Sequence, residues 1–168
     1  MIAIGEKYEL VISSMRVLSL LEAFKKNKTY QMTFDKIILF DFYMKFPQTM
    51  IRDGDDMSNF DFEELYSFFH AHPDRDSYHR ILNFVLSKGL VSKEILNSSF
   101  IYKITDVGIE VVNDIQNPFS DRMKANAFLI KKNISKMSET KIKEEINHSN
   151  SNNNDEILKN NNDIIPDE

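Results

Sequence analysis

The stretch YHRILNFVLSKGLVSKEILNSSFIYKITDVGIEVVNDIQ, residues 78–116, decides the fold of this chain. In its first third, apolar residues recur at helical spacing, which predicts a helix with one buried face. The apolar positions of that face are Ile81, Leu82, Val85 and Leu86. Gly89 follows, and glycine suits the position just past the end of a helix. The sequence therefore predicts a helix that ends at this glycine.

The middle of the same stretch, GLVSKEILNSSFIYKIT (residues 89–105), predicts a strand, a turn and a second strand. Thr105 is then predicted to cap a further helix, DVGIEVVNDIQ. A helix followed by a hairpin and another helix is the order of a winged-helix domain. We therefore expect a mainly α fold with a small β-hairpin, in which residues 1–117 form a winged-helix-like body.

Three helices are predicted before this unit, and the last of them is the short helix FDFEELYSFFHA (60–71). Residues 6–26 carry apolar side chains at helical spacing. Thr33 is a predicted N-cap for FDKIILFDFYMKF (34–46), which is apolar on nearly every side and should be the central buried helix. Asp41 within it is either a buried acid bonded to backbone or arginine, or a catalytic group. We favour the first, because no second acid lies at a neighbouring helical position.

Residues 118–147, which follow the break at Pro118, are predicted to form a long C-terminal helix. One apolar face of this helix is either a surface for a partner or ordinary packing against the body. The residues of this face are Met123, Ala127, Ile130, Ile134 and Met137. Seven of the last 21 residues are asparagine, and residues 148–168 are predicted to be a disordered acidic tail.

Composition limits the classes of function. The 168 residues carry a net charge of −5 and contain no cysteine, which excludes disulfides and cysteine-based zinc sites. Residues 1–120 hold 13 Lys/Arg against 17 Asp/Glu, residues 121–147 seven against four, and the tail one against five. We find no signal peptide and no apolar run long enough to span a membrane, and we predict a cytoplasmic protein.

The stretch FHAHPDRDSYHR, residues 69–80, is the candidate for a metal site. It contains three of the four histidines, His70, His72 and His79. The spacing H-x-H-x-D is similar to the start of the metal site of metallo-β-lactamase hydrolases. That pattern needs another histidine where this chain has Arg75, and the only later histidine is His148.

A site built from these three histidines alone remains an alternative, since imidazoles suit zinc and similar ions. We favour a structural interpretation. Pro73 breaks one helix, and Asp76 or Ser77 caps the next. No glycine-rich phosphate loop and no G-x-S-x-G motif occur. We therefore predict no catalytic, metal or cofactor-binding residue, and no enzyme.

Cations near the predicted hairpin could contact phosphate or a partner. They are Arg75, His79, Arg80 and Lys88 on or near the preceding helix, and Lys93 and Lys103 on the hairpin. In winged-helix proteins the helix before the hairpin usually enters the major groove. A DNA-binding transcription regulator is therefore the alternative function. The acidic net charge and the largely apolar helix argue against DNA binding by this unit alone.

Residues 8–115 resemble the small middle components of bacterial ABC-three component systems, which include Lamassu-type anti-phage defence. The matching patches are MRVLSLLEAF (15–24), FDKIILFDFYMKF (34–46), HPDRDSYHR (72–80), LNFVLSKGLV (82–91) and FIYKITDVG (100–108). In the second patch, Asp35, Asp41 and Phe42-Tyr43 match the family's Asp-x-x-x-x-x-Asp-Tyr pattern. The family often continues there into a His-Ser-Gly-Asp-like stretch, where this chain has Lys45-Phe46-Pro47-Gln48.

The resemblance implies a winged-helix accessory subunit. Its partners would be a coiled-coil SMC/Rad50-like ATPase and an effector subunit, often a nuclease. The small subunit would bridge the two, and DNA would be contacted only through the complex. No catalytic residue carries over from the family, and no cofactor is implied.

Overall fold

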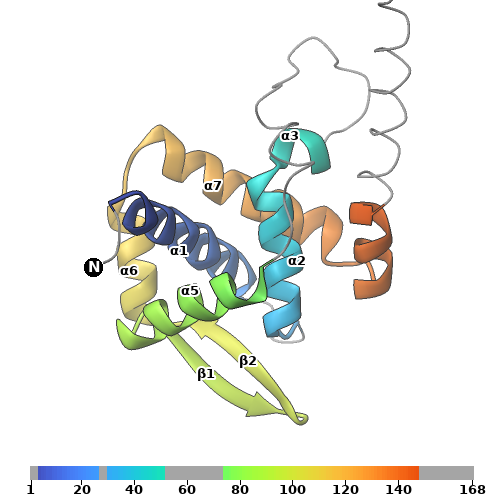
Figure 1. The fold of residues 1–168 in the computed structure, drawn as a ribbon, viewed down its shortest axis with the longest axis horizontal. Helices are drawn as coiled ribbons and strands as arrows, with labels where there is room; N and C mark the ends of the chain where they lie inside the picture. Colours follow the sequence, from blue (N-terminus) through green and yellow to red (C-terminus); the bar gives the residue numbers. More distant parts are fainter. Residues whose placement is uncertain (1–3, 27–29, 52–73, 148–168) are drawn as a thin grey trace, which may run out of the picture.

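Helices surround a single apolar core, and one β-hairpin projects from it in the computed structural model (Figure 1). The structure describes residues 4–26, 30–51 and 74–147, so the helix predicted over residues 60–71 lies outside the described part of the chain. Its elements are α1 (Ile4–Phe24), α2 (Phe34–Lys45), α3 (Pro47–Met50), α5 (Arg75–Ser87), β1 (Val91–Leu96), β2 (Ser99–Ile104), α6 (Asp106–Asp114), α7 (Pro118–Leu129) and η2 (Ile130–Ile134), followed by a helix over residues 139–147. This confirms the predicted mainly α fold with a small hairpin, whereas its identification as a winged helix stays a prediction.

The hairpin has the predicted position and a tight turn. β1 pairs antiparallel with β2, and Ile95 lies opposite Phe100 in the register. Asn97 and Ser98 form the turn with φ angles of 49° and 64°. Two successive positive φ angles match the twist of a two-residue hairpin turn, and asparagine tolerates this region better than most residues. The turn therefore fixes the register that sends Ile95 and Phe100 to the same face.

The residues around the hairpin base behave largely as the sequence predicts. Gly89 has a φ of 69° just past α5, which is the left-handed conformation that favours glycine. Thr105 caps α6 by accepting a hydrogen bond from Gly108 N at 3.1 Å, and its hydroxyl donates to Gly89 O. A Cβ added at Gly108 would lie 2.2 Å from Leu90 O. The start of α6 thus packs directly on the backbone that enters β1.

The N-cap of α5 differs from the prediction. Asp74 caps this helix by accepting from Asp76 N at 3.0 Å, in place of Asp76 or Ser77. Ser77 instead donates its hydroxyl to Asp74 Oδ2, and this hydrogen bond lowers the pKa of Asp74. All three residues are good capping types within one turn, so only the backbone geometry decides between them.

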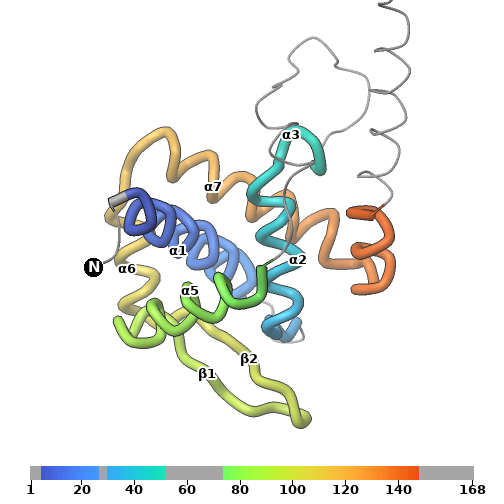
Figure 2. The backbone as a smooth tube through the Cα atoms, viewed as in Figure 1, coloured from blue at the N-terminus to red at the C-terminus, as the bar shows by residue number. Residues whose placement is uncertain are grey.

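α2 is the buried central helix that the sequence predicts. Thr33 caps it by accepting from Lys36 N, and every residue from Ile37 to Met44 is buried. α2 contacts α1, α7, η2 and β2, and Figure 2 shows it between α1 on one side and the last helix on the other. Because all sides of α2 meet other elements, its apolar residues form the middle of the core.

The C-terminal segment is helical but is not one long helix, which corrects the prediction. α7 ends at Leu129 and continues as the π-helical turn η2, after which residues 135–138 form a turn and residues 139–147 a further helix. The backbone changes direction before this last helix (Figure 2). Ile142 and Ile146 of the last helix are buried in the same core as Val17 and Phe40. The segment therefore wraps around the body and completes its core.

Candidate interaction surfaces

Arg75 and His79 lie together at the start of α5, and both contact the ring of Phe34. The His79 ring stacks on Phe34 at 4.3 Å between centroids, and the Arg75 guanidinium lies 4.8 Å from the same ring. Arg75 Nη1 also lies 2.5 Å from Asp35 Oδ1. The charge of Arg75 is thus already partly neutralised by an acid of α2.

The other two cations of α5 are more available. Arg80 donates to the Ser77 hydroxyl at 3.1 Å, and Lys88 Nζ lies 5.8 Å from the Phe84 ring. Both side chains are exposed. Within the residues that the structure describes, neither forms an ion pair. They remain candidates for contact with a phosphate or an acidic partner.

The two hairpin lysines have different surroundings. Lys103 Nζ lies 2.5 Å from Glu94 Oε2, across the two strands. Lys93 Nζ instead lies 3.9 Å from the centroid of the Phe100 ring, near the hairpin tip. Such a contact keeps the cation beside an apolar surface. The six predicted residues therefore lie on α5, at its C-cap and on the two strands of the hairpin, and acids partly neutralise Arg75 and Lys103.

The predicted partner face of the C-terminal segment lies inside the molecule. Its exposed fractions are 5% for Met123, 0% for Ala127 and Ile130, and 8% for Ile134, and Met137 is half-buried. α7 packs along α1. This corrects the expectation of a surface for a partner and supports the alternative of ordinary packing, because a buried face has no area left to offer.

The histidine-rich stretch is only partly described. His70 and His72 lie outside the described residues, and His79 is exposed and stacked on Phe34. Across residues 4–26, 30–51 and 74–147, no group of three or more His, Cys, Asp or Glu is arranged to hold a metal ion. In the same ranges, no helix is long and apolar enough to cross a membrane.

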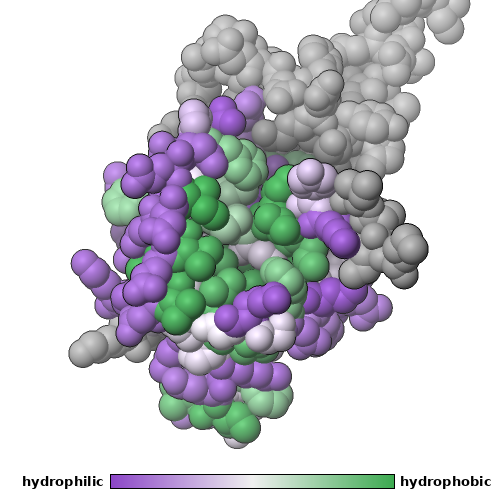
Figure 3. Space-filling view, turned by 90° about the vertical axis from the view of Figure 1, so that its left-hand side faces the viewer, coloured by the Kyte–Doolittle hydropathy of each residue, from purple (hydrophilic) through white to green (hydrophobic). Residues whose placement is uncertain are grey.

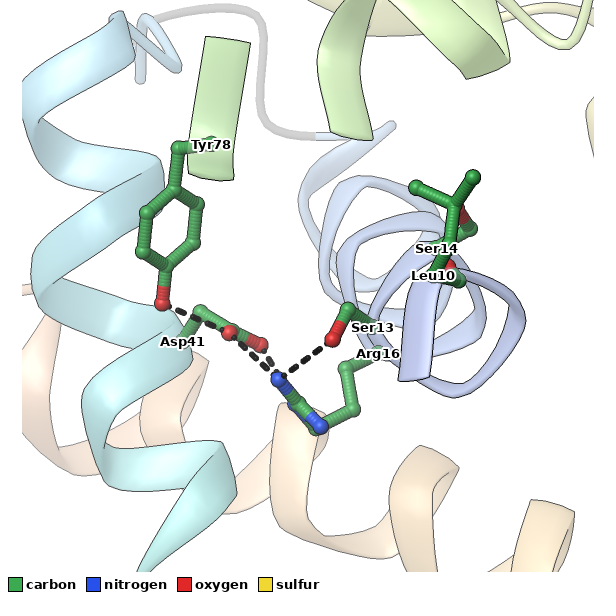
Figure 4. A network of polar contacts seen from close by, with 6 residues as sticks. All are labelled: Leu10, Ser13, Ser14, Arg16, Asp41 and Tyr78. Carbon is green, nitrogen blue, oxygen red and sulfur yellow. Dashed lines mark hydrogen bonds and ion pairs between the residues drawn. The ribbon is translucent and has the colours of Figure 1, made fainter. Parts of the chain in front are cut away.

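Asp41 is the centre of a buried polar network that joins three helices (Figure 4). Its carboxylate is 0% exposed and accepts two hydrogen bonds from Arg16 of α1, Nε to Oδ1 at 2.9 Å and Nη2 to Oδ2 at 3.1 Å. Tyr78 of α5 donates its hydroxyl to Oδ2 at 2.8 Å. Arg16 Nη2 also donates to the Ser13 hydroxyl. The favoured interpretation, a buried acid bonded to arginine, is confirmed.

The ionisation of this network follows from its burial. Burial and the neighbouring Asp41 carboxylate both raise the pKa of Tyr78 well above its usual range, so its hydroxyl stays protonated. Burial alone would lower the pKa of Arg16, but the adjacent Asp41 charge and hydrogen bonds raise it. The ion pair between Arg16 and Asp41, with the protonated Tyr78 hydroxyl as a further donor, therefore joins the three helices.

The polar residues that α2 shares with the family pattern contact α1, α5 and the last helix. Asp35 pairs with Arg75 of α5, and Asp41 joins α1 and α5. Tyr43 donates its hydroxyl to Glu145 of the last helix at 3.1 Å. Burial, followed by the charge of Glu145, raises the pKa of Tyr43 far above its usual range. These residues therefore fix the arrangement of helices around α2.

Sequence reasoning did not find the partners of these α2 residues. Arg16, Tyr78 and Glu145 lie 25, 37 and 102 residues from the α2 side chains that they contact. No local pattern of spacing connects residues so far apart in the chain. The resemblance identified the α2 residue of each pair. The partner residue is identified only by the fold.

The hairpin tip carries large exposed apolar side chains, with exposed fractions of 72% for Ile95, 43% for Leu96 and 51% for Phe100. On the strand face that carries Ile95 and Phe100, Val91 and Tyr102 at the hairpin base are buried in the core, whereas Leu96 lies on the opposite face. Figure 3 shows hydrophobic residues at the lower end of the molecule, below a hydrophilic band. The apolar face of the hairpin thus continues outward beyond the part that the core covers. Clustered exposed apolar residues commonly mark interaction sites.

Comparison with known proteins identifies the family. Residues 10–156 match the model of the family described as ABC-three component (ABC-3C) system Middle Component 2. No curated protein and no solved structure matches the chain. The match extends past the limit of the resemblance at residue 115 and includes α7, η2 and the last helix. The chain belongs to this family, and it acts with the other components of such a system.

Proposed function

We propose that this protein is a non-catalytic accessory subunit that couples an SMC-like coiled-coil ATPase to an effector subunit in bacterial defence against phages or plasmids. The observation that carries this proposal is the family match over residues 10–156, which covers almost the whole described body. A middle component acts with other components, so its main requirement is a surface for them. Lamassu-type defence is the subclass we expect.

The polar side chains of α2 bond to other side chains of the protein, and this supports a non-catalytic role. Asp41 is fully buried between Arg16 and Tyr78, and Tyr43 contacts Glu145. A general acid or base needs a pKa near the working pH and access to substrate. The pKa values of Tyr43 and Tyr78 are both raised away from neutrality by burial and by the adjacent acids. These groups suit structural pairing.

The hairpin tip is the surface that we assign to the ATPase. Ile95 and Phe100 are directly opposite each other and largely exposed, and Lys93 lies beside the Phe100 ring. Coiled coils present apolar side chains next to flanking charged positions, often glutamate. A tip with two apolar anchors and an adjacent lysine complements such a surface. A standard interface buries about 800 Å² per partner, so the hairpin would be its anchor and neighbouring elements would complete it.

Co-expression with the components encoded next to this chain tests the proposal. An affinity tag on this chain should retain the ATPase component through a salt wash, and the complex should elute as one species on size-exclusion chromatography. If the ATPase and effector are each expressed and folded, yet neither is retained, the proposed coupling role is wrong.

A winged-helix transcription regulator remains the second candidate, because Arg80 and Lys88 on α5 are exposed and have no ion-pair partner among the described residues. Salt-sensitive binding to a defined duplex would support it. Arg80→Ala and Lys103→Ala should then weaken that binding. If both variants bind the duplex as tightly as the wild type, this function is excluded.

A further inference from the structure

A shallow hollow of about 510 Å³ opens beside η2, on a part of the molecule that has no role in the proposed function. Its lining residues are Tyr30, Phe128, Lys131, Lys132, Ser135 and Lys136. Three lysines, two aromatic rings and a hydroxyl therefore surround one open space. We call this set of residues the lysine hollow.

The three lysines of the hollow have no acidic partner in the part of the chain that the structure describes. Lys132 and Lys136 are exposed and Lys131 is half-buried. Lys36 also contacts one residue of the hollow, because its Nζ lies 4.5 Å from the centroid of the Tyr30 ring. Unlike Arg75 and Lys103 elsewhere in the molecule, these lysines form no ion pair with a described acid; the acid whose charge acts on the hollow is Glu139, through Tyr30.

The backbone gathers these side chains through an unusual turn. Ser135 N donates to Ile130 O at 3.1 Å, which is the hydrogen bond of a π-helix, and Ser135 Oγ donates to Lys131 O. π-helical turns are rare and often occur at functional sites. Ile130 and Ile134 of this turn both enter the core, whereas Lys131 is half-buried and Lys132 and Lys136 are exposed.

The aromatic residues of the hollow differ in their exposure. Phe128 is 61% exposed although α7 buries Met123 and Ala127 in the core. Tyr30 packs against Phe24 and Phe40. Burial and the charge of Glu139 raise the pKa of Tyr30 to about 12, so its hydroxyl stays protonated at neutral pH. The hollow therefore offers one free aromatic face and a neutral hydroxyl beside several cations.

We infer that the lysine hollow binds single-stranded nucleic acid, with phosphates at the lysines and one unstacked base on Phe128. Grooves for single strands combine positive charge along the backbone with exposed aromatic rings on which bases stack. A duplex keeps its bases stacked inside and would leave Phe128 unused. An acidic peptide would satisfy the lysines but has no flat ring system to cover the phenylalanine.

The inference is independent of the proposed coupling role, since it concerns direct binding by the isolated chain. The test measures fluorescence anisotropy of a labelled single-stranded thymidine homopolymer with the full chain at two salt concentrations. Three phosphate contacts predict that affinity falls about 18-fold between about 50 and 200 mM salt. A Lys132→Gln/Lys136→Gln variant should bind more weakly and lose only about threefold over the same range.

The matched control for charge is Lys7→Gln, which removes an exposed lysine near the start of α1, away from the hollow. It should bind the oligonucleotide like the wild type. If the wild type does not bind it, or if Lys7→Gln and the double variant lose the same affinity, the inference is wrong.

The stacking contact has its own test. Phe128→Ala should lower affinity about fivefold to tenfold without changing the salt dependence, whereas Phe119→Ala, also exposed on α7, should leave affinity unchanged. Both residues are exposed, so thermal unfolding of the two variants should match the wild type. A polyglutamate peptide that competes as well as the oligonucleotide, together with no effect of Phe128→Ala, would contradict nucleic-acid recognition and indicate an acidic protein partner.

Discussion

α2 and the hairpin tip differ in the burial and pairing of their side chains. α2 buries an aspartate and a tyrosine and gives each a partner on another helix. The hairpin tip leaves Ile95 and Phe100 largely exposed and pairs them only with each other and with Lys93. The contacts of α2 side chains within the chain hold the helices together. The exposed side chains of the hairpin tip are the ones that we propose contact the other components. Substitutions in α2 should therefore change stability, and substitutions at the tip should change binding.

The largest effect is expected at Asp41. Asp41→Ala leaves Arg16, whose side chain is 14% exposed, as a largely buried charge without its partner and removes the acceptor of Tyr78, which should lower the free energy of unfolding by about 3 kcal/mol. Urea denaturation monitored by circular dichroism measures this change. The control is Asp35→Ala, whose pair with Arg75 is about half exposed and should contribute no more than about 1 kcal/mol. Equal losses in both variants would contradict the assigned role of the network.

The next effect is expected at Gly108, where the hairpin base and α6 meet. A methyl group would lie 2.2 Å from Leu90 O, so Gly108→Ala must shift the backbone and should cost about 1–3 kcal/mol. The control is Gly5→Ala in α1, where an added Cβ has no atom within 4 Å. That variant should be as stable as the wild type or slightly more stable. Thermal unfolding of the pair distinguishes a steric effect from a general effect of replacing glycine.

The elements that were predicted correctly have local signals. Thr33 and Thr105 stand before apolar runs and cap the helices that follow, and Gly89 takes the left-handed conformation past α5. Each of these caps and turns depends on a few adjacent residues, so the sequence alone is sufficient to predict it. The buried position of α2 was also predictable, because its residues are apolar on nearly every side.

The features that were missed depend on distant contacts or on competing local ones. The break of the C-terminal helix at η2 and residues 135–138 contains no proline or glycine; its local signal is Ser138, which caps the last helix by accepting from Lys141 N at 3.2 Å, whereas burial of Ile130 and Ile134 depends on distant contacts. For the same reason, the candidate partner face could not be distinguished from core. The arginine that satisfies Asp41 lies one helix away, and only the fold places it there.

A smaller effect is expected from alkaline pH through Tyr30. The pKa of Tyr30 is raised from its ordinary value of 10.0 to about 12 in the folded protein. Burial is the larger cause, and the charge of Glu139 is the second. Its protonated hydroxyl therefore supports stability that is fully present below pH 10 and is lost as pH rises towards 12. Tyr30→Phe should lose less stability than the wild type over this range, as measured by urea denaturation at each pH. The control Tyr8→Phe, at an exposed residue, should follow the wild type.

The smallest effect on stability is expected at the hairpin tip. Ile95→Ser with Phe100→Ser removes one cross-strand pair and one cation–π contact, both at the surface, and should change the free energy of unfolding by less than about 1 kcal/mol. Val91→Ser on the same strand face is the contrast, because Val91 is 3% exposed and its loss should cost several-fold more. A tip variant as unstable as Val91→Ser would mean that the tip belongs to the core.

The most direct test of the account is retention of the ATPase component by the folded tip variant. The tagged Ile95→Ser/Phe100→Ser chain is co-expressed with the neighbouring components, beside Val107→Ser, which changes an exposed apolar residue of α6. We predict that the tip variant, with unchanged thermal unfolding, loses the ATPase while the wild type and Val107→Ser retain it. Equal retention by the tip variant and the wild type would contradict the claim that the exposed hairpin is the docking surface.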